Sequence, residues 1–251
     1  MKLQGGPNIC GATIGVLCLE SSFPKPPGHI KNPSGLCFPV LYETVRGATV
    51  AKLINEPPAE FIEPFLDAAK RLEAEGVGAI TGSCGFLALF QKELAAAVSI
   101  PVFASSLIQV PMVHHMLGGG KRVGVLTASA RKLTPRHFEA VGAGGIPVAI
   151  EGMEDQPEFR EVILEGRRSD MDVTRIAREI LSAAQSLVTK NRDIGAVVLE
   201  CTDMPPYAHR IQESLRLPVF DLTTLATMVH DVVLRRAYDG IMPRTVRPAA
   251  V

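Results

Sequence analysis

Two cysteines follow apolar runs of the chain and could carry out chemistry. Cys84 ends the run "GAITGSC" (78–84) and Cys201 ends the run "IGAVVLEC" (194–201), and a helix-like stretch follows each of them. A thiol placed where a buried strand passes into a helix faces the free N–H groups and partial positive charge of the helix N-terminus. We therefore expect the pKa of each thiol to fall from about 8.5 toward neutrality.

Two such thiols on opposite sides of one cleft suit the inversion of configuration at a carbon atom. One thiolate removes the α-proton from one face, and the other thiol delivers a proton to the opposite face. This chemistry predicts a separation of about 7–8 Å between the two sulfur atoms. Because Asp203 follows Cys201 closely and would raise its pKa, we expect Cys84 to be the more acidic thiol. The alternative is that both thiols are core residues, since free cysteine is among the most buried residue types.

The segments around the two cysteines repeat each other. Residues 78–103 align without a gap on residues 195–220, and the alignment superposes the two cysteines. It also superposes the Pro-Val-Phe of residues 101–103 on that of residues 218–220. This register favours an internal duplication, whereas composition alone would make any two α/β units look alike.

Short apolar runs alternate with helix-like stretches along the rest of the chain. The runs lack polar alternation, as expected of parallel strands buried on both faces, and they cover residues 13–20, 76–84, 100–105, 122–129, 146–152, 194–201 and 217–222. We predict an α/β fold of two flavodoxin-like parallel-sheet halves related by a pseudo-twofold axis, with the site in the cleft between them. The first half spans residues 1–107, completed by the C-terminal helical segment 223–251, and the second spans residues 108–222.

Other segments are assigned from their helix and turn signals. Helices are expected over residues 59–76, 105–120 and 169–191, with Ser169 or Asp170 as the N-cap of the last and Gly76 as the stop of the first. Residues 21–40 are rich in proline and glycine. They are expected to form a loop that is long enough to be functional.

Composition excludes several classes of protein. The chain has 251 residues, and its 26 basic and 26 acidic side chains give no net charge, so nucleic acid is not expected as a partner. The five cysteines are odd in number and widely spaced, which argues against a disulfide framework and a zinc site. No apolar run reaches the ~20 residues of a membrane helix, and no cofactor motif is present. We expect a cytoplasmic protein without membrane, metal or cofactor.

The chain resembles the aspartate/glutamate/hydantoin racemase superfamily, the cofactor-independent racemases. The resemblance covers nearly the whole chain and is carried by "TGSCGF" (81–86), "RVGVLTAS" (122–129) and "LECTDMP" (199–205). It implies a two-domain α/β fold with Cys84 and Cys201 as the acid/base pair. The loop "FPKPPGHIKNP" is similar to one found in a racemase-like branch of the superfamily.

The chain also departs from the glutamate racemases that it resembles. Gly85 and Phe86 follow the first cysteine where those enzymes carry Asn-Thr, and Asp203 stands where they carry His. Glu20 and Ser21 are the nearest match to the Asp-Ser after their first strand. The thiols match, but much of the expected substrate-binding shell does not, so the substrate is expected to differ from glutamate.

Candidate substrate-binding residues lie beside the cysteines or at the ends of neighbouring strands. They are Glu20, Ser21, Ser83, Gly85, Phe86, Thr127, Ser129, Thr202 and Asp203. Backbone N–H groups after the cysteines, with the Thr202 hydroxyl, could bind a carboxylate, and Glu20 or Asp203 could bind an ammonium group. The alternative for these side chains is ordinary helix capping or surface exposure.

The leading hypothesis is a racemase or epimerase that inverts the α-carbon of a small carboxylate, such as an amino acid or a hydantoin-like compound. Within the superfamily, a cis–trans isomerase and an arylmalonate-type decarboxylase remain alternatives. A third alternative is a ligand-binding protein without catalytic activity. The expected partner is a small-molecule carboxylate, and a homo-oligomer remains open.

Overall fold

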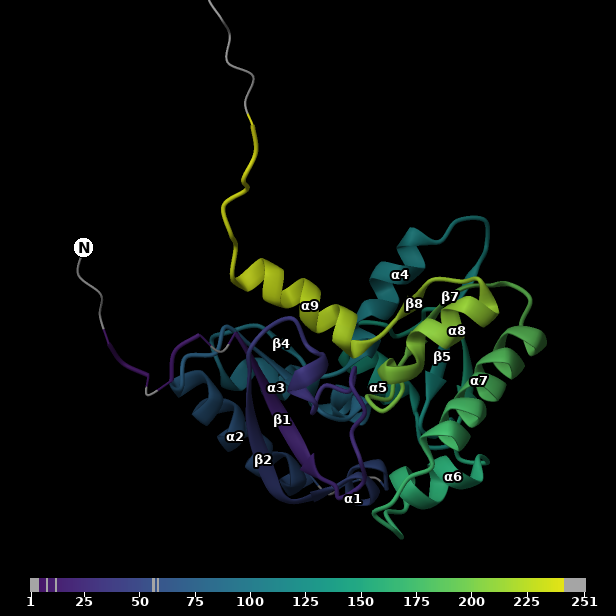
Figure 1. Cartoon of the computed structure of the whole chain (residues 1–251), viewed down its shortest axis with the longest axis horizontal. Coiled ribbons are helices and arrows are strands. Elements are labelled where there is room, and N and C mark those ends of the chain that lie inside the picture. The colour runs from purple at the N-terminus through teal and green to yellow at the C-terminus, as the bar shows by residue number, and fades with distance from the viewer. Residues whose placement is uncertain (1–4, 8, 12, 56, 58, 242–251) are drawn as a thin grey trace, which may run out of the picture.

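The chain forms two parallel sheets, each in its own half of the molecule (Figure 1). A computed structural model describes residues 5–7, 9–11, 13–55, 57 and 59–241. The strand order is β2-β1-β3-β4 in one sheet and β6-β5-β7-β8 in the other, so the two sheets have the same topology. This is the strand order of flavodoxin-like folds. The predicted α/β fold with two such halves is confirmed.

The central strands of both sheets are apolar and buried. The first sheet contains β1 (Ile14–Glu20), β2 (Val40–Thr49), β3 (Ala79–Gly82) and β4 (Val102–Phe103). The second contains β5 (Arg122–Thr127), β6 (Val148–Gly152), β7 (Ile194–Leu199) and β8 (Val219–Phe220). All of these except β2 lie within the apolar runs of the sequence, and each is shorter than its run.

Strand β2 is the element that the sequence pattern does not predict. It pairs in parallel with β1 at the edge of the first sheet, from Val40 beside Ile14 to Thr49 beside Glu20. Most of its residues are half-buried or exposed, so it lacks the continuous apolar run that identifies the central strands. The proline-rich loop therefore leads into a strand that pairs with β1.

Nine α-helices surround the sheets within the described residues. They are α1 (Val50–Ile54), α2 (Glu63–Ala74), α3 (Gln91–Ala97), α4 (Val110–Met116), α5 (Pro135–Ala140), α6 (Pro157–Phe159), α7 (Val173–Lys190), α8 (Ala208–Leu215) and α9 (Leu222–Val233). A π-helical turn, Arg160–Leu164, continues α6. None of the helices in the described part of the chain is both long and apolar enough to cross a bilayer.

The helix ends differ in detail from the expected ones. Helix α7 begins after Asp172, whose carboxylate accepts hydrogen bonds from the N–H groups of Thr174 and Arg175, both at 3.0 Å. The predicted N-cap, Ser169 or Asp170, is therefore wrong by two or three residues, because another acidic side chain reaches the free N–H groups. Gly76 follows the end of α2 with a φ of +84°, as expected of a helix stop.

Helix α9 lies back over the first half of the molecule (Figure 1). Leu222 and Leu225 of α9 share a buried cluster with Ile14, Val16 and Ala79 of the first sheet. The sequence assigns the segment 223–251 to this half, and residues 242–251 of it lie outside the described residues. The remaining core is one larger cluster that includes residues of both sheets. The two halves are thus packed together through a shared core.

Candidate active site

Both candidate catalytic cysteines lie in turns at the carboxyl ends of central strands. Cys84 follows β3 and is the N-cap residue of the 3₁₀ turn Gly85–Phe90, and Cys201 follows β7. They are 8% and 6% exposed, and both line one closed pocket between the halves. The structure therefore brings together the two thiols that the repeat singles out. Their acid/base roles and the expected separation of the sulfur atoms stay predictions.

Hydrogen bonds between the halves fix the two cysteine turns relative to each other. The Thr202 hydroxyl donates to the backbone oxygen of Ser83 at 2.7 Å, and the Ser106 hydroxyl donates to the backbone oxygen of Leu199 at 2.6 Å. All four groups are buried, where such bonds are strongest. Because the Thr202 proton is used in this contact, the predicted binding of a carboxylate by Thr202 would require the bond to break.

The surroundings of the thiols do not make them acidic, contrary to the expectation from the sequence. Burial and then the Glu200 carboxylate raise the pKa of Cys84, although the Phe86 N–H acts in the opposite direction. Burial, followed by the charges of Asp203 and Glu200, raises the pKa of Cys201 well above its ordinary value. No carboxylate lies beside Cys84 in the sequence, but Glu200 of the second half is close enough to raise its pKa. Something that enters the pocket must therefore stabilise a thiolate before either sulfur can act as a base.

Asp203 links Cys201 to a histidine from the first half. The Cys201 thiol donates to Oδ2 of Asp203 at 3.5 Å, and Nε2 of His29 lies 3.1 Å from Oδ1. The backbone N–H of Lys31 donates to Nδ1 of His29 at 2.9 Å, so the proton of a neutral His29 ring lies on Nε2. Both carboxylate oxygens of Asp203 are thus occupied, and Cys201 is held as the protonated thiol.

His29 and Lys31 belong to the proline-rich loop 21–40, and sequence reasoning does not find them. The ammonium group of Lys31 donates to the backbone oxygen of Leu19 at 2.7 Å and to the Ser21 hydroxyl at 2.9 Å, and it lines the pocket. The length and composition of the loop were the available signals of function. They indicate no particular residue, because only the docking of the loop places these side chains at the site.

Glu200 is a third residue that the sequence reasoning does not find. It precedes Cys201, is fully buried and lines the pocket. Its Oε2 accepts hydrogen bonds from the Thr127 hydroxyl at 2.8 Å and the Ala128 N–H at 3.4 Å. Its Oε1 is buried without a hydrogen-bond partner among the described residues. Burial raises the pKa of Glu200 to about 7, against the lowering effect of these two donors.

Gly85 makes room for Glu200. A β-carbon on Gly85 would lie 2.1 Å from Oε1 of Glu200 and 2.2 Å from the Glu200 backbone oxygen. A side chain as large as asparagine could not occupy this position without moving the turn after β7. The departure from the glutamate racemase pattern at Gly85 thus has a steric reason. Phe86 lines the same pocket and packs edge-on against His137, with ring centroids 5.1 Å apart.

The remaining predicted substrate-binding residues divide between the pocket and its surroundings. Those that line the pocket are Ser21, Ser83, Gly85, Phe86, Thr202 and Asp203. Thr127 is buried behind Glu200, Ser129 is buried in the turn after β5, and Glu20 is exposed and lines an outer pocket instead. The structure does not bring these last three to the thiols, and their predicted contacts with a substrate have no support in its geometry.

Two short helical elements close the pocket on its outer side. Val50 and Ile54 come from α1, and Ile163 comes from the π-helical turn of the second half. The free volume within the pocket is about 20 Å³, which is enough for a single water molecule. An outer pocket of about 380 Å³ lies next to it and shares Phe23, Val50 and Ile163 as lining residues. These side chains thus separate the thiols from an open vestibule.

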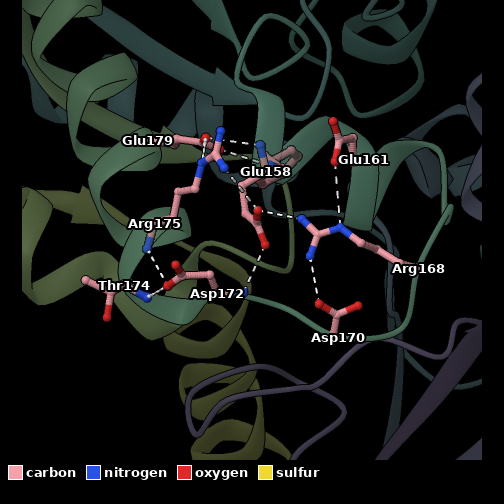
Figure 2. Close-up of polar contacts among 9 residues, drawn as sticks. Glu158, Glu161, Arg168, Asp170, Asp172, Thr174, Arg175 and Glu179 are labelled. Carbon is pink, nitrogen blue, oxygen red and sulfur yellow. Dashed lines mark hydrogen bonds and ion pairs between the residues drawn. The ribbon is translucent and has the colours of Figure 1, made fainter.

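Glu179 of α7 holds the segment that carries Ile163. Its two carboxylate oxygens accept hydrogen bonds from the N–H groups of Glu158 and Phe159, at 3.0 and 2.9 Å (Figure 2). Arg175 donates to the same carboxylate at 3.3 Å. Glu179 is therefore a cap for α6 that comes from another helix.

Glu158 belongs to the same group of charged side chains as Glu179 and Arg175. It is 2% exposed, and its carboxylate accepts hydrogen bonds from the Arg168 guanidinium at 2.5 Å and the Asp172 N–H at 2.9 Å (Figure 2). Arg168 also bonds to Asp170 at 2.9 Å. These ion pairs and hydrogen bonds hold the segment from α6 to the start of α7 in place. They therefore also fix the π-helical turn whose Ile163 closes the pocket on the side of the second half.

Comparison with known proteins places this fold and pocket in a family. A sequence model of the family described as Asp/Glu/Hydantoin racemase matches residues 107–229, which include Cys201 and Glu200. The chain is also 30% identical over 223 residues to a dimethylsulfoniopropionate lyase of Durusdinium sp. clade D, covering 86% of this chain and 73% of that protein. The chain belongs to the Asp/Glu/hydantoin racemase superfamily. The resemblance inferred from the cysteine motifs is confirmed.

Other members of the superfamily are similar to this one. The chain is 34% identical over 222 residues to dimethylsulfoniopropionate lyase 7 of Emiliania huxleyi (strain CCMP1516). That match covers 84% of this chain and 64% of the relative, so the chain spans less than two thirds of that protein's length. A mutant of arylmalonate decarboxylase has the same fold, with a TM-score of 0.60 and 14% identity over 88% of this chain and 92% of that chain. The superfamily is one of enzymes, and its sequence relatives here are named as lyases.

Proposed function

We propose that this superfamily member is a lyase that cleaves dimethylsulfoniopropionate into dimethyl sulfide and acrylate. The observation that carries the proposal is the pair of thiols, Cys84 and Cys201, in one closed pocket next to fixed carboxylates. The identity of about a third to proteins named dimethylsulfoniopropionate lyases supports this substrate. The sequence alone suggests a racemase, and the two reactions share their first step, removal of the proton α to a carboxylate.

The proposed reaction is a β-elimination. A thiolate takes the α-proton, the electrons of that C–H bond form the carbon–carbon double bond, and the electrons of the carbon–sulfur bond leave with neutral dimethyl sulfide. Cys84 suits the role of base, because the Phe86 N–H favours its thiolate, whereas Cys201 donates its proton to Asp203. The cationic sulfonium would stabilise the thiolate in the pocket, where burial otherwise opposes it.

Lys31 suits the role of carboxylate receptor. Its ammonium group uses two of its three donors on the backbone of Leu19 and on Ser21, and the third is available to a ligand in the pocket that Lys31 lines. A cation that neutralises the substrate carboxylate also makes the α-proton more acidic, because negative charge moves toward the carboxylate as the proton leaves. This loop residue thus assists both binding and chemistry.

The assay measures dimethyl sulfide by gas chromatography and acrylate by liquid chromatography after addition of dimethylsulfoniopropionate. We expect both products in equal amounts. Cys84→Ser should lower the rate by about 100-fold or more, since a serine hydroxyl cannot replace the thiolate base. Cys201→Ser should lower it less, because a neutral leaving group needs no acid. Cys37→Ser, which changes an exposed thiol outside the pocket, is the matched control and should retain full rate.

Racemisation or epimerisation of a small carboxylate is the second candidate, because two thiols at one pocket can serve the two faces of a carbon. It predicts that Cys84→Ser and Cys201→Ser abolish turnover alike. Single enantiomers of amino and hydroxy acids in heavy water would then gain α-deuterium and lose optical rotation. Deuterium gain and lost rotation, without dimethyl sulfide, would replace the lyase proposal with this one. Absence of all products, with thiols that react slowly with alkylating agents, would favour a ligand-binding protein.

A further inference from the structure

The free oxygen of Glu200 is the feature of the pocket that the proposed reaction leaves unused. We propose that Oε1 of Glu200 binds the cationic group of the substrate, so that the site selects zwitterionic carboxylates with a positive charge at the β-position. The identity of that cation as a sulfonium rests on the proposed function. The selection of a cation over a neutral group of the same shape rests on Glu200 itself.

Three residues fix the position of this oxygen. Thr127 and Ala128 hold the other oxygen of the carboxylate, so the group cannot rotate without losing both hydrogen bonds. Gly85 allows Oε1 to approach the turn that carries Cys84, where any β-carbon would collide with it. The oxygen is therefore held beside the thiol turn, and its position does not depend on a flexible side chain.

A buried carboxylate oxygen without a partner is unfavourable, and a ligand can relieve this. Glu200 is fully buried, and Oε1 has no hydrogen-bond partner among residues 13–55 and 59–241. The other carboxylate of the pocket, Asp203, is already occupied by His29 and the Cys201 thiol. A sulfonium has no N–H to donate, so it is held by charge alone, and an unpaired carboxylate oxygen suits it.

A cation beside Glu200 would also activate the chemistry. The Glu200 charge now contributes to the raised pKa of Cys84, and neutralising it with a bound cation removes that contribution. Lys31 lies in the same pocket and can take the carboxylate end of the ligand. The pocket thus offers one receptor for each end of a zwitterion, and the thiol becomes a better base only when the correct ligand is bound.

The experiment compares two ligands of the same shape. Dimethylsulfoniopropionate carries a positive sulfur where isocaproate, its neutral isostere, carries a CH group. Binding is measured by calorimetry in a Cys84→Ser background, in which turnover does not consume the ligand. The background protein should bind dimethylsulfoniopropionate at least about tenfold more tightly than isocaproate, as expected for a buried charge pair. Adding Glu200→Gln should remove most of this preference and change isocaproate binding by less than about twofold.

Two further variants separate charge from structure. Glu200→Asp keeps the charge and should restore part of the preference for the cation. Glu213→Gln removes an exposed carboxylate on α8 and should leave both affinities unchanged. Thermal unfolding of each variant verifies that the pocket is folded.

Equal weakening of both ligands by Glu200→Gln would overturn the inference, because it would indicate a structural role. An unchanged preference for the cation, or failure of the background protein to bind either ligand, would overturn it as well. The proposed function is tested separately by dimethyl sulfide release from the wild-type protein. If that release is absent while the Glu200-dependent preference for the cation persists, the lyase proposal fails and the cation receptor stands.

Discussion

At the scale of single residues, the pocket combines two thiols with a carboxyl group that titrates near neutrality. Burial raises the pKa of Glu200 from an ordinary 4.5 to about 7, and the acidic groups around it, Cys84, Cys201 and Asp203, do not lower it. The folded protein therefore keeps a proton on Glu200 at pH values where the unfolded chain has released it. Raising the pH from about 4.5 to about 7 should therefore lower the free energy of unfolding.

We predict that this decrease is visible in the pH dependence of stability. Between about pH 5 and pH 8 the wild-type protein should lose up to about 3 kcal/mol of unfolding free energy relative to Glu200→Gln. The sign follows because the unfolded chain releases this proton above about pH 4.5 whereas the folded protein keeps it until about pH 7, so stability falls between these values and is constant above them. Urea unfolding of both proteins at several pH values measures the difference. A constant difference across this range would show that Glu200 does not titrate there.

The cysteines and several pocket-lining residues beside them could be predicted from the sequence, but Glu200, His29 and Lys31 could not. A repeated motif at the end of an apolar run places Cys84 and Cys201 at equivalent strand ends, and parallel-sheet topology then brings those ends together. Glu200 carries no such pattern, because its free oxygen results from the burial of one residue against Gly85. The predicted low pKa of the thiols is also wrong. The sequence indicates where helices begin, and so where their dipoles lie, but it does not indicate that the thiols are buried beside two carboxylates.

At the scale of elements, the π-helical turn Arg160–Leu164 depends on a cap from outside its own helix. Glu179 of α7 accepts the N–H groups of Glu158 and Phe159, while Arg175 balances its charge (Figure 2). These bonds hold the segment whose Ile163 lines the pocket. Removing the negative charge of Glu179 should therefore change how the pocket is closed.

Glu179→Gln should lower the free energy of unfolding by about 1–3 kcal/mol, because a charged acceptor for two buried N–H groups is lost. The same change should increase proteolytic cleavage within residues 157–168 and raise KM more than it lowers kcat. Chemical unfolding, limited proteolysis and steady-state kinetics measure the three effects. Glu213→Gln, on exposed α8, is the control and should change none of them. Cleavage unaffected by Glu179→Gln would mean that Phe159 and Ile163 hold the segment by packing alone.

The elements themselves were predictable to different degrees. Central strands appear as apolar runs, whereas the edge strand β2 does not, because its half-exposed residues follow no such pattern. The N-cap of α7 was displaced to Asp172 because several acidic and hydroxyl residues near that helix start could serve, and only the packing of α6 decides among them. The sequence identifies residues 21–40 as a loop, but the contacts of this loop with the second half depend on tertiary structure.

At the scale of the whole molecule, the site lies between the two halves, and its closure must open for a ligand to enter. The free volume of about 20 Å³ is far below the volume of dimethylsulfoniopropionate, and α1 and the turn Arg160–Leu164 stand between the thiols and the vestibule. These elements come from different halves and meet at the lower edge of the molecule (Figure 1). A short movement of either one would connect the two pockets.

We predict that ligand binding slows hydrogen–deuterium exchange in residues 50–54 and 160–164. In the free protein α1 (Val50–Ile54) should open often because it is a single short helix, and each opening exposes the turn 160–164 that it contacts. Bound isocaproate or dimethylsulfoniopropionate in the Cys84→Ser background should keep them closed. Mass spectrometry of the exchanged protein measures this, and residues 208–215 of α8 should be unaffected. Equal exchange with and without ligand would mean that entry follows another route.

The docked loop has an evolutionary consequence. A duplicated scaffold starts with two equivalent thiols, and a site with that symmetry treats both faces of a carbon alike, which suits reversible inversion. Here the first half alone sends His29 across to Asp203, and Gly28, with a φ of +97°, fits against Pro206 of the second half. The docking of one loop thus makes the two thiols unequal without changing either. If the proposed function holds, a change in how one existing connection docks is enough to turn a site suited to inversion into one suited to one-way elimination, with both cysteines in place.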